Sequence, residues 1–127
     1  MFGNLKTWLI LTMSLTAGGI NCYAKADCFS CEIHVNNLED PLDLRGNWLF
    51  TKEDHPTNKN SALDDSRWKQ VVTPGHWKNI YDDGKPFSVG WYRGYFKFHP
   101  DLVGKKVVLL MDTYMGEFDF YVDGRFG

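Results

Sequence analysis

The stretch Gly90-Trp91-Tyr92-Arg93-Gly94-Tyr95-Phe96 is the part of the chain that decides the fold. It is rich in aromatic residues, and a second stretch, Phe118-Asp119-Phe120-Tyr121-Val122, alternates between apolar and polar positions. Both patterns are typical of β-strands, in which successive side chains point to opposite faces of a sheet. The dipeptide Asp123-Gly124 follows directly and is a hairpin-turn signal. We therefore expect two strands here, the second ending in a tight turn.

The sequence on either side contains further strand signals and no convincing helical period. An alternating segment covers residues 42–50, a short apolar segment covers 67–73, and a continuous apolar run covers 105–111. The run 105–111 is expected to form a strand that is buried on both faces. Polar residues and Pro56 fill the interval 51–66, which predicts a loop. These patterns predict an all-β chain.

The alternation within residues 90–99 also predicts which side chains face the core. The even positions carry large side chains, namely Tyr92, Phe96 and Phe98. The odd positions carry Arg93, Lys97 and His99. Because a strand has a side-chain period of two, we expect the first set to be buried and the second set to face solvent.

Residues 1–26 are predicted to be a signal peptide. Lys6 supplies a positive charge, residues 8–20 are mostly apolar, and Ala24-Lys25-Ala26 matches a signal-peptidase site. The apolar run is shorter than the ~20 residues that a membrane-spanning helix needs. We therefore expect secretion, with a mature chain that begins at Asp27. Such a chain would lie in the periplasm or on the extracytoplasmic face of the membrane.

Charge and cysteine content narrow the classes of function. Loss of Lys6 and Lys25 with the leader would lower the basic count from 14 to 12 against 16 acidic residues, for a formal charge of −4. Because phosphate binding needs clustered Lys and Arg, we expect no nucleic-acid partner. The lead-in 27–41 keeps Cys28 and Cys31, and an oxidising compartment favours a disulfide between them. A redox role for this pair would need a βαβ setting, for which the sequence gives no sign.

Aromatic residues around the polar loop 82–88 are the candidate ligand-binding residues. The four that flank the loop are Trp77, Tyr81, Trp91 and Tyr92. Aromatic faces with polar side chains nearby suit a small ligand such as a sugar, although packing in the core accounts for such residues equally well. Arg93 is the candidate clamp for a carboxylate or a sugar hydroxyl, because its planar fork makes paired hydrogen bonds. A salt bridge, or a hydrogen bond that pins a loop, is the alternative role for Arg93.

Catalytic and metal-binding patterns are weak. The four histidines share no spacing typical of metal ligands, and the acid pairs 64–65 and 82–83 fall short of a calcium-binding set. The four glutamates are widely spread, whereas a retaining glycosidase holds two carboxyl groups ~5 Å apart. We expect no metal, no cofactor and no catalysis by this chain itself.

Residues 42–124 carry a series of short motifs in a defined order. They are Leu-x-Gly-x-Trp-x-Phe at 44–50, Asp-Asp-Ser-Arg-Trp at 64–68, Val-x-x-Pro-Gly-x-Trp at 71–77, Gly-Trp-Tyr-Arg at 90–93 and Tyr-Val-Asp-Gly at 121–124. In this order they resemble the galactose-binding-like jelly roll, a β-sandwich. That fold opens the β-galactosidase/β-glucuronidase family of glycoside hydrolases. A relative of it forms the extracytoplasmic sensor domain of bacterial seven-helix membrane signalling proteins.

The resemblance implies a non-catalytic recognition domain over residues 42–127. Its ligand would be a small molecule, most simply a carbohydrate. The sensor setting implies a bacterial signalling protein with downstream membrane and cytoplasmic domains, and the alternative setting is the front domain of a secreted glycoside hydrolase. The turn at Asp123-Gly124 calls for a return strand, yet the sequence ends at Gly127. We therefore expect an incomplete jelly roll, from a longer protein or completed by a partner.

Overall fold

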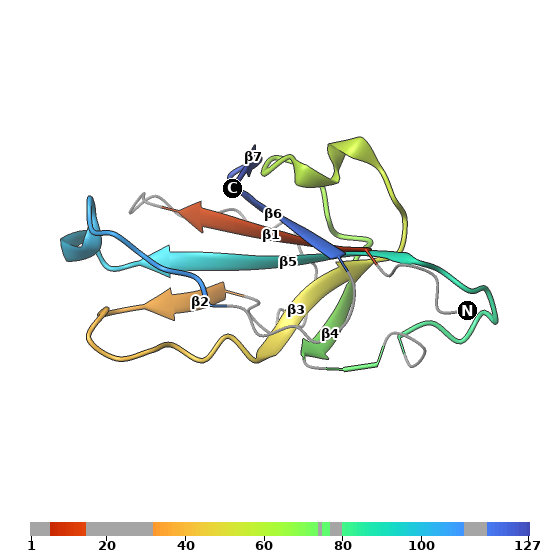
Figure 1. Ribbon diagram of the computed structural model, residues 1–127, viewed down its shortest axis with the longest axis horizontal. Coiled ribbons are helices and arrows are strands. Elements are labelled where there is room, and N and C mark those ends of the chain that lie inside the picture. Colours follow the sequence, from red (N-terminus) through yellow and green to blue (C-terminus); the bar gives the residue numbers. More distant parts are fainter. Residues whose placement is uncertain (1–5, 15–31, 74, 77–79, 111–116) are drawn as a thin grey trace.

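Strands dominate the structure. The computed structural model describes residues 6–14, 32–73, 75–76, 80–110 and 117–127, with 6–14 as backbone only (Figure 1). The strands in these residues are β1 (Lys6–Ser14), β2 (Glu32–Val35), β3 (Gly46–Thr51), β4 (Lys69–Thr73), β5 (Val89–Phe98), β6 (Glu117–Val122) and β7 (Arg125–Phe126). The helices in these residues are two short 3₁₀ segments, η1 (Pro56–Lys59) and η3 (Pro100–Leu102). The all-β expectation is confirmed.

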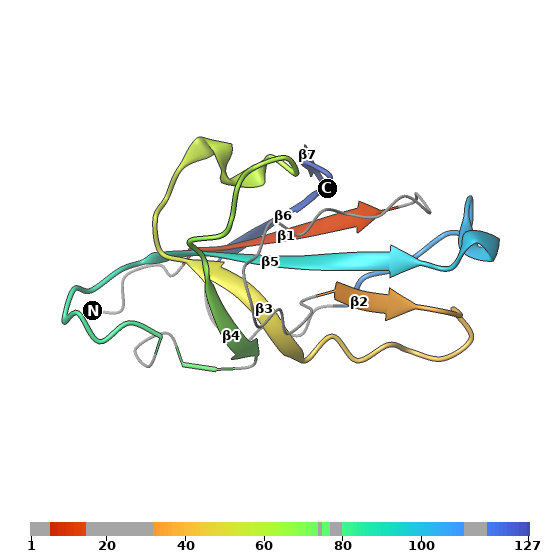
Figure 2. The same cartoon turned by 180° about the vertical axis from the view of Figure 1, so that it is seen from behind.

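The strands form one curled, mixed sheet with β5 at its centre (Figures 1 and 2). The main order is β4-β3-β5-β1-β6-β7, and β2 also pairs with β5. Strands β3 and β4 are antiparallel, as are β3 and β5, whereas β1 and β2 run parallel to β5. Strand β5 covers residues 89–98. Its aromatic residues favour the extended conformation of a strand that packs on both faces.

The predicted hairpin after β6 is confirmed. Strands β6 and β7 are antiparallel, with Tyr121 opposite Phe126 and Val122 opposite Arg125. The two residues between them, Asp123 and Gly124, have φ values of 48° and 81°. A two-residue turn with both φ values positive matches the right-handed twist of the flanking strands, which is why Asp-Gly is favoured there.

The core lies on the face of the sheet to which the even residues of β5 point. Val35, Trp48 and Phe96 are its buried centre, and the partly buried Tyr92 and Phe98 pack against it. This distribution confirms the predicted core face of β5. Gly94 is essential to the arrangement, because a Cβ at this position would lie 2.7 Å from the Trp48 ring. The absent side chain lets the Trp48 indole rest directly on β5.

The opposite face of β5 differs from the expectation at Arg93. Lys97 and His99 are exposed as predicted, but the Arg93 side chain has no exposed surface. The loop that contains η1 folds over this face, and its backbone carbonyl groups surround the guanidinium group. The prediction of a solvent-facing Arg93 was wrong because strand alternation assigns a face without showing which loop covers it.

The apolar run at 105–111 also differs from the expectation. The described part, residues 105–110, contains no strand, and the side chains of Val108 and Leu110 are 68% and 85% exposed. Leu109 alone in this segment packs against the core. An apolar run forms a buried strand only where a neighbouring strand pairs with it, and β1 and β6 pair with each other instead.

Strands lie within both of the predicted N-terminal segments, the signal peptide 1–26 and the lead-in 27–41. Strand β1 lies within the predicted signal peptide, and its backbone is paired in the sheet. Strand β2 lies within the predicted lead-in 27–41. Cys28 and Cys31 lie outside the described residues, so the predicted disulfide stays a prediction.

Candidate functional site

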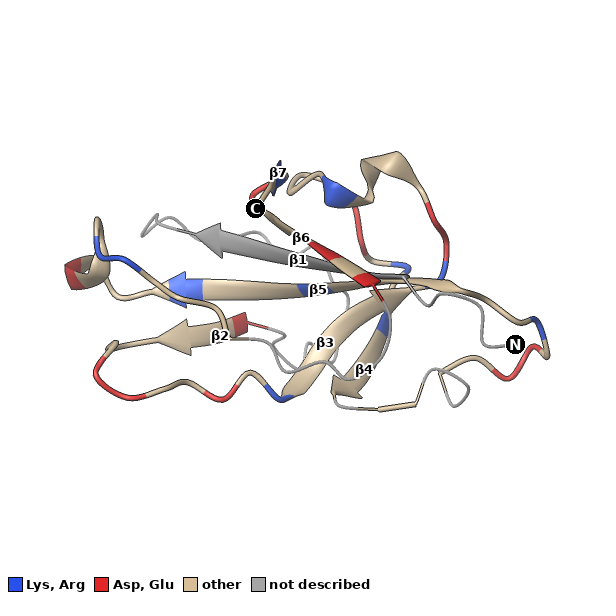
Figure 3. Ribbon diagram, in the orientation of Figure 1, with Lys and Arg blue, Asp and Glu red and all other residues tan. Residues whose placement is uncertain are grey.

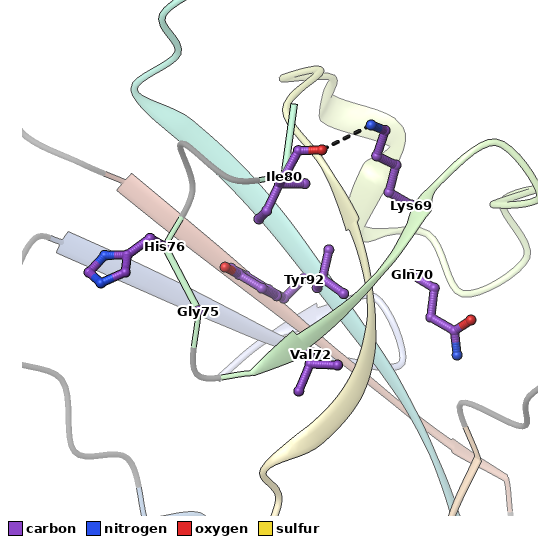
Figure 4. Close-up of a pocket in the computed structure, with 8 residues that line it drawn as sticks. Lys69, Gln70, Val72, Gly75, His76, Ile80 and Tyr92 are labelled. Atoms are coloured by element: carbon purple, nitrogen blue, oxygen red, sulfur yellow. Dashed lines mark hydrogen bonds between the residues drawn. The ribbon is translucent and has the colours of Figure 1, made fainter. Parts of the chain in front are cut away.

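A pocket of about 400 Å³ opens beside Tyr92 on the core face of the sheet (Figure 4). Its lining comes from β4, from the segment that follows it and from β5: Lys69, Gln70, Val71, Val72, Gly75, His76, Ile80 and Tyr92. Figure 4 shows the Tyr92 ring below the Ile80 side chain, with its hydroxyl on the side of His76, while the Val72 and Gln70 side chains lie on the other side of the β4 ribbon. The pocket therefore combines the aromatic ring of Tyr92 with both apolar and polar side chains.

Polar groups at the rim give this pocket hydrogen-bonding capacity. The Lys69 ammonium group donates to the Ile80 carbonyl oxygen at 2.9 Å, which ties the rim segment to β4. An ammonium group has three donors, and this is the hydrogen bond that it makes to the described residues. His76 is exposed at the other side of the pocket, and Gln70 is exposed on β4. Among the described residues of the lining, Lys69 carries the one permanent charge, and that charge is positive.

Period-two alternation explains why these residues meet. On β4, Lys69 and Val71 stand opposite Phe50 and Trp48 of β3, both of which are core residues. Tyr92 stands opposite Phe50 from the other side, with ring centroids 4.7 Å apart. The side chains of Lys69, Val71 and Tyr92 therefore share the core face of the sheet, whereas those of Gln70 and Val72 point to the other face of β4.

Tyr81 lies next to the pocket in an aromatic cluster. Its ring packs edge-on against Phe87 with centroids 5.9 Å apart, and against Phe50 at 6.1 Å. Two ammonium groups lie over the Tyr81 ring, those of Lys52 at 4.7 Å and Lys69 at 4.3 Å from its centroid. Cation–π contacts of this kind hold lysine side chains in place. Tyr81 thus positions Lys69 at the rim.

An ion pair fixes the loop beside this cluster. Lys52 donates to the Asp83 carboxylate. The hydrogen bond from Lys52, together with one from the Lys85 backbone N–H group, lowers the pKa of Asp83 below its ordinary value. This pair holds the loop 82–86 near the Tyr81 ring.

The predicted binding residues Trp91 and Arg93 lie on the other face of the sheet. Trp91 is 3% exposed, its indole N–H group donates to Asp54 Oδ1 at 3.0 Å, and its ring stacks on Tyr121. The structure therefore separates Trp91 and Arg93 from Tyr92 and Tyr81. Trp77, the fifth predicted residue, lies outside the described residues.

Arg93 is the centre of a buried network. Its guanidinium group donates to the carbonyl oxygens of Asn58 at 2.6 Å and Asn60 at 3.1 Å, and to Asp65 Oδ2 at 2.9 Å. It also lies 4.6 Å from the centroid of the Trp68 ring. These contacts match the loop-pinning role that the sequence left open as an alternative.

Tyr95 joins the same network. Its hydroxyl donates to Asp65 Oδ2, the oxygen that also accepts from Arg93. Burial, and the hydrogen bond to Asp65, raise the pKa of Tyr95 to about 12 from an ordinary 10.0. The arrangement stabilises a neutral phenol beside an ion pair.

The sequence indicated the region of the pocket but not its lining. Tyr92 was identified as a flanking aromatic residue, whereas Lys69, Gln70 and His76 were missed. Pairing of β4 with β3 brings Lys69 and Gln70 to the site, and no local motif marks them. The Pro74-Gly75 break just before His76 was the available signal, because a chain that turns at the end of a strand places the next side chain at its rim.

Acidic and basic residues are interspersed along the described chain (Figure 3). Within this part of the chain, no three His, Cys, Asp or Glu side chains converge as a metal site would require. The described residues also contain no helix with the length and apolar character needed to cross a bilayer.

Comparison with known proteins adds no relative to this description. No protein-family model matches the chain, and searches of curated proteins and of solved structures return no match.

Proposed function

We propose that the chain is a non-catalytic recognition domain that binds a small carbohydrate in the pocket beside Tyr92. The observation that carries the proposal is the composition of the pocket. An aromatic ring forms its floor, and Lys69 and His76 stand at its rim. Binding sites for small polar ligands combine apolar walls with a few placed polar groups in this way.

The charge of the rim narrows the ligand class. Lys69 gives the lining a positive charge, and a hydrogen bond between an ammonium group and a carboxylate is stronger than one between neutral groups. A carbohydrate that carries a carboxylate, such as a uronic acid, therefore fits this pocket better than a neutral sugar. We propose an acidic sugar as the preferred ligand.

The motif series supports a wider setting for this proposal. The order of motifs over residues 42–124 resembles the galactose-binding-like jelly roll, and the all-β sheet agrees with that class at the level of secondary structure. We propose that the domain is the extracytoplasmic sensor of a larger bacterial signalling protein, exported by residues 1–26. The alternative, a front domain of a glycoside hydrolase, is supported by the same motifs.

Calorimetric titration of the chain with glucuronate and with glucose tests the proposal. We expect tighter binding of glucuronate. The variant Lys69→Met keeps the length of the side chain and removes its charge, so it should weaken glucuronate binding by about tenfold or more, because hydrogen bonds to charged groups contribute about 1.5–3 kcal/mol. Glucose binding should change less.

The matched control is Lys97→Met. Lys97 is exposed on β5, outside the pocket lining. This variant should bind glucuronate as the unaltered chain does. Equal loss of affinity in both lysine variants would show a general charge effect and refute a site at the pocket.

A further inference from the structure

The position of β1 in the sheet is unusual for a segment predicted to be removed. Strand β1 lies between β5 and β6 and runs parallel to both (Figures 1 and 2). Its register runs from Lys6 opposite Val89 to Ser14 opposite Lys97 on β5, and from Lys6 opposite Glu117 on β6. Strands β5 and β6 are thus two strand spacings apart, roughly 10 Å.

Contacts that do not involve β1 hold β5 and β6 at this separation. The rings of Trp91 on β5 and Tyr121 on β6 stack with centroids 6.1 Å apart and planes 22° apart. On the other face, Val122 of β6 packs against the core cluster that contains Phe96 of β5. Side chains from the two strands therefore meet on both sides of the sheet.

The loop 54–65 adds a second connection between β5 and β6. Arg93 anchors the loop to β5 through the Asn58 and Asn60 carbonyl oxygens. At its far end, the Lys59 ammonium group lies 6.0 Å from the Tyr121 ring centroid. The Lys59 carbonyl oxygen is close to the β6–β7 turn, only 3.3 Å from where a Cβ would stand on Gly124. The loop thus bridges from β5 to the β6–β7 hairpin.

We propose that the interval between β5 and β6 is a strand-binding site, in which an extended apolar segment of another polypeptide replaces β1. Cleavage after Ala26 would separate β1 from the chain, and the facing edges of β5 and β6 would then present backbone groups that need partners. An extended segment that inserts between two such edges satisfies both at once. This inference is separate from the pocket beside Tyr92.

The sequence of β1 defines the chemistry of the occupant. The strand is Lys-Thr-Trp-Leu-Ile-Leu-Thr-Met-Ser, with its one charge at the first position. The residues after Lys6 carry no charge and pair with positions 90–97 of β5 and 118–122 of β6. The site therefore takes an extended segment of about nine residues that is uncharged over its length and contains no proline in its centre.

Strand exchange in the full chain tests the proposal. A protease site inserted between Ala26 and Asp27 allows the leader to be cut in the folded protein. A dye-labelled peptide with the sequence of residues 6–14 is then added, and native mass spectrometry follows the replacement. We expect one labelled peptide per chain and release of the leader. A control peptide with Leu9→Pro and Leu11→Pro should compete at least about tenfold more weakly, because proline removes ladder donors.

A second variant covers the case in which cutting itself disturbs the fold. The uncut chain with Leu9→Pro and Leu11→Pro cannot fill the interval with its own leader, so it should bind the unaltered peptide. The unaltered uncut chain should not. Failure of the peptide to enter the cut chain, or to bind the proline variant, would overturn the proposal. Dimerisation of the cut chain without peptide uptake would assign the interval to a second copy and would also overturn it.

Discussion

At the scale of single residues, Arg93 contributes most to the architecture of the loop that covers β5. One guanidinium group connects the strand to the Asn58 and Asn60 carbonyl oxygens and to the Asp65 carboxylate. Within the described residues its Nε atom has no hydrogen-bond partner. The guanidinium group rests against Trp68, which shields that side of it. The side chain thus acts as a structural connector on the face opposite the pocket.

Replacement of Arg93 should destabilise the protein strongly. Gln at this position cannot reach the same set of acceptors. Loss of the guanidinium group removes a donor from the carbonyl oxygens of Asn58, Asn60 and Leu63 and the cationic partner of the Asp65 carboxylate, which keeps its hydrogen bond from Tyr95. Removal of one member of a buried pair has a cost of about 3–5 kcal/mol in comparable cases. Because Asp65 keeps 19% exposure, we expect a loss of about 3 kcal/mol in the free energy of unfolding of Arg93→Gln, measured by urea denaturation.

The matched control for this change is Arg45→Gln. Arg45 forms an ion pair with Asp43, and both side chains are exposed. The substitution should leave the urea midpoint close to that of the unaltered chain, because exposed ion pairs contribute little to stability. Glucuronate binding should survive in any fraction of Arg93→Gln that remains folded. A small stability loss together with abolished binding would return Arg93 to the ligand site.

The Tyr95 phenol should give the protein a distinct response to alkali. Its pKa is raised from 10.0 to about 12 by burial and by the hydrogen bond to Asp65. A raised pKa means that the folded state holds this proton more tightly than the unfolded state. The resulting stability is complete below pH 10 and is lost as pH rises toward 12. Titration of tyrosinate absorbance should show this late step in the unaltered chain, and Tyr95→Phe should lack it. Persistence of the step in the variant would assign it to another tyrosine.

At the scale of elements, the packing of β3 beside β5 depends on the pair Trp48 and Gly94. The Trp48 indole N–H group donates to the Leu44 carbonyl oxygen at 2.8 Å, which fixes the ring. An added methyl group at residue 94 would lie 2.7 Å from that ring. Two neighbouring strands thus approach closely because one of them carries no side chain at the contact.

A double-mutant cycle tests this packing. Gly94→Ala should lower the free energy of unfolding by about 1–3 kcal/mol, since overpacking forces a ring or a strand to shift. Trp48→Phe should also be destabilising, because the smaller ring loses contacts and the hydrogen bond to Leu44. The double variant should be more stable than the sum of the two losses predicts. Strict additivity in urea denaturation would show that the two residues do not contact each other.

Sequence patterns predicted the elements well where local chemistry determines them. The turn at Asp123-Gly124 follows from the preference of these residues for positive φ values, and it is confirmed. The core face of β5 follows from the alternation of its side chains, and it is also confirmed. The run 105–111 was wrong as a strand because its burial depends on a neighbouring strand. The burial of Arg93 depends on a loop some thirty residues away in sequence. Non-local contacts of this kind leave no signature in a local pattern.

At the scale of the whole molecule, the sheet separates two sites. The pocket beside Tyr92 lies on the core face of the sheet. The Arg93 network lies on the opposite face, beneath the loop 54–65. The sequence placed Tyr81, Trp91, Tyr92 and Arg93 in one region because they are close along the chain. The period of two then divides them between faces, which limited how much of the site could be predicted. Lys69 and Gln70 arrive from β4 through strand pairing alone.

Recognition of an acidic sugar at the Tyr92 pocket is the central claim, and chemical-shift mapping by NMR tests it most directly. Glucuronate is titrated into the isotope-labelled full chain while backbone amide shifts are followed. We predict saturable shifts that cluster at residues 69–72, 75–76, 80 and 92, the described residues that line the pocket. Shifts confined to the opposite face, around Trp91 and Arg93, would contradict the assignment of the site. The absence of shifts at every concentration of glucuronate and of glucose would contradict the recognition function itself.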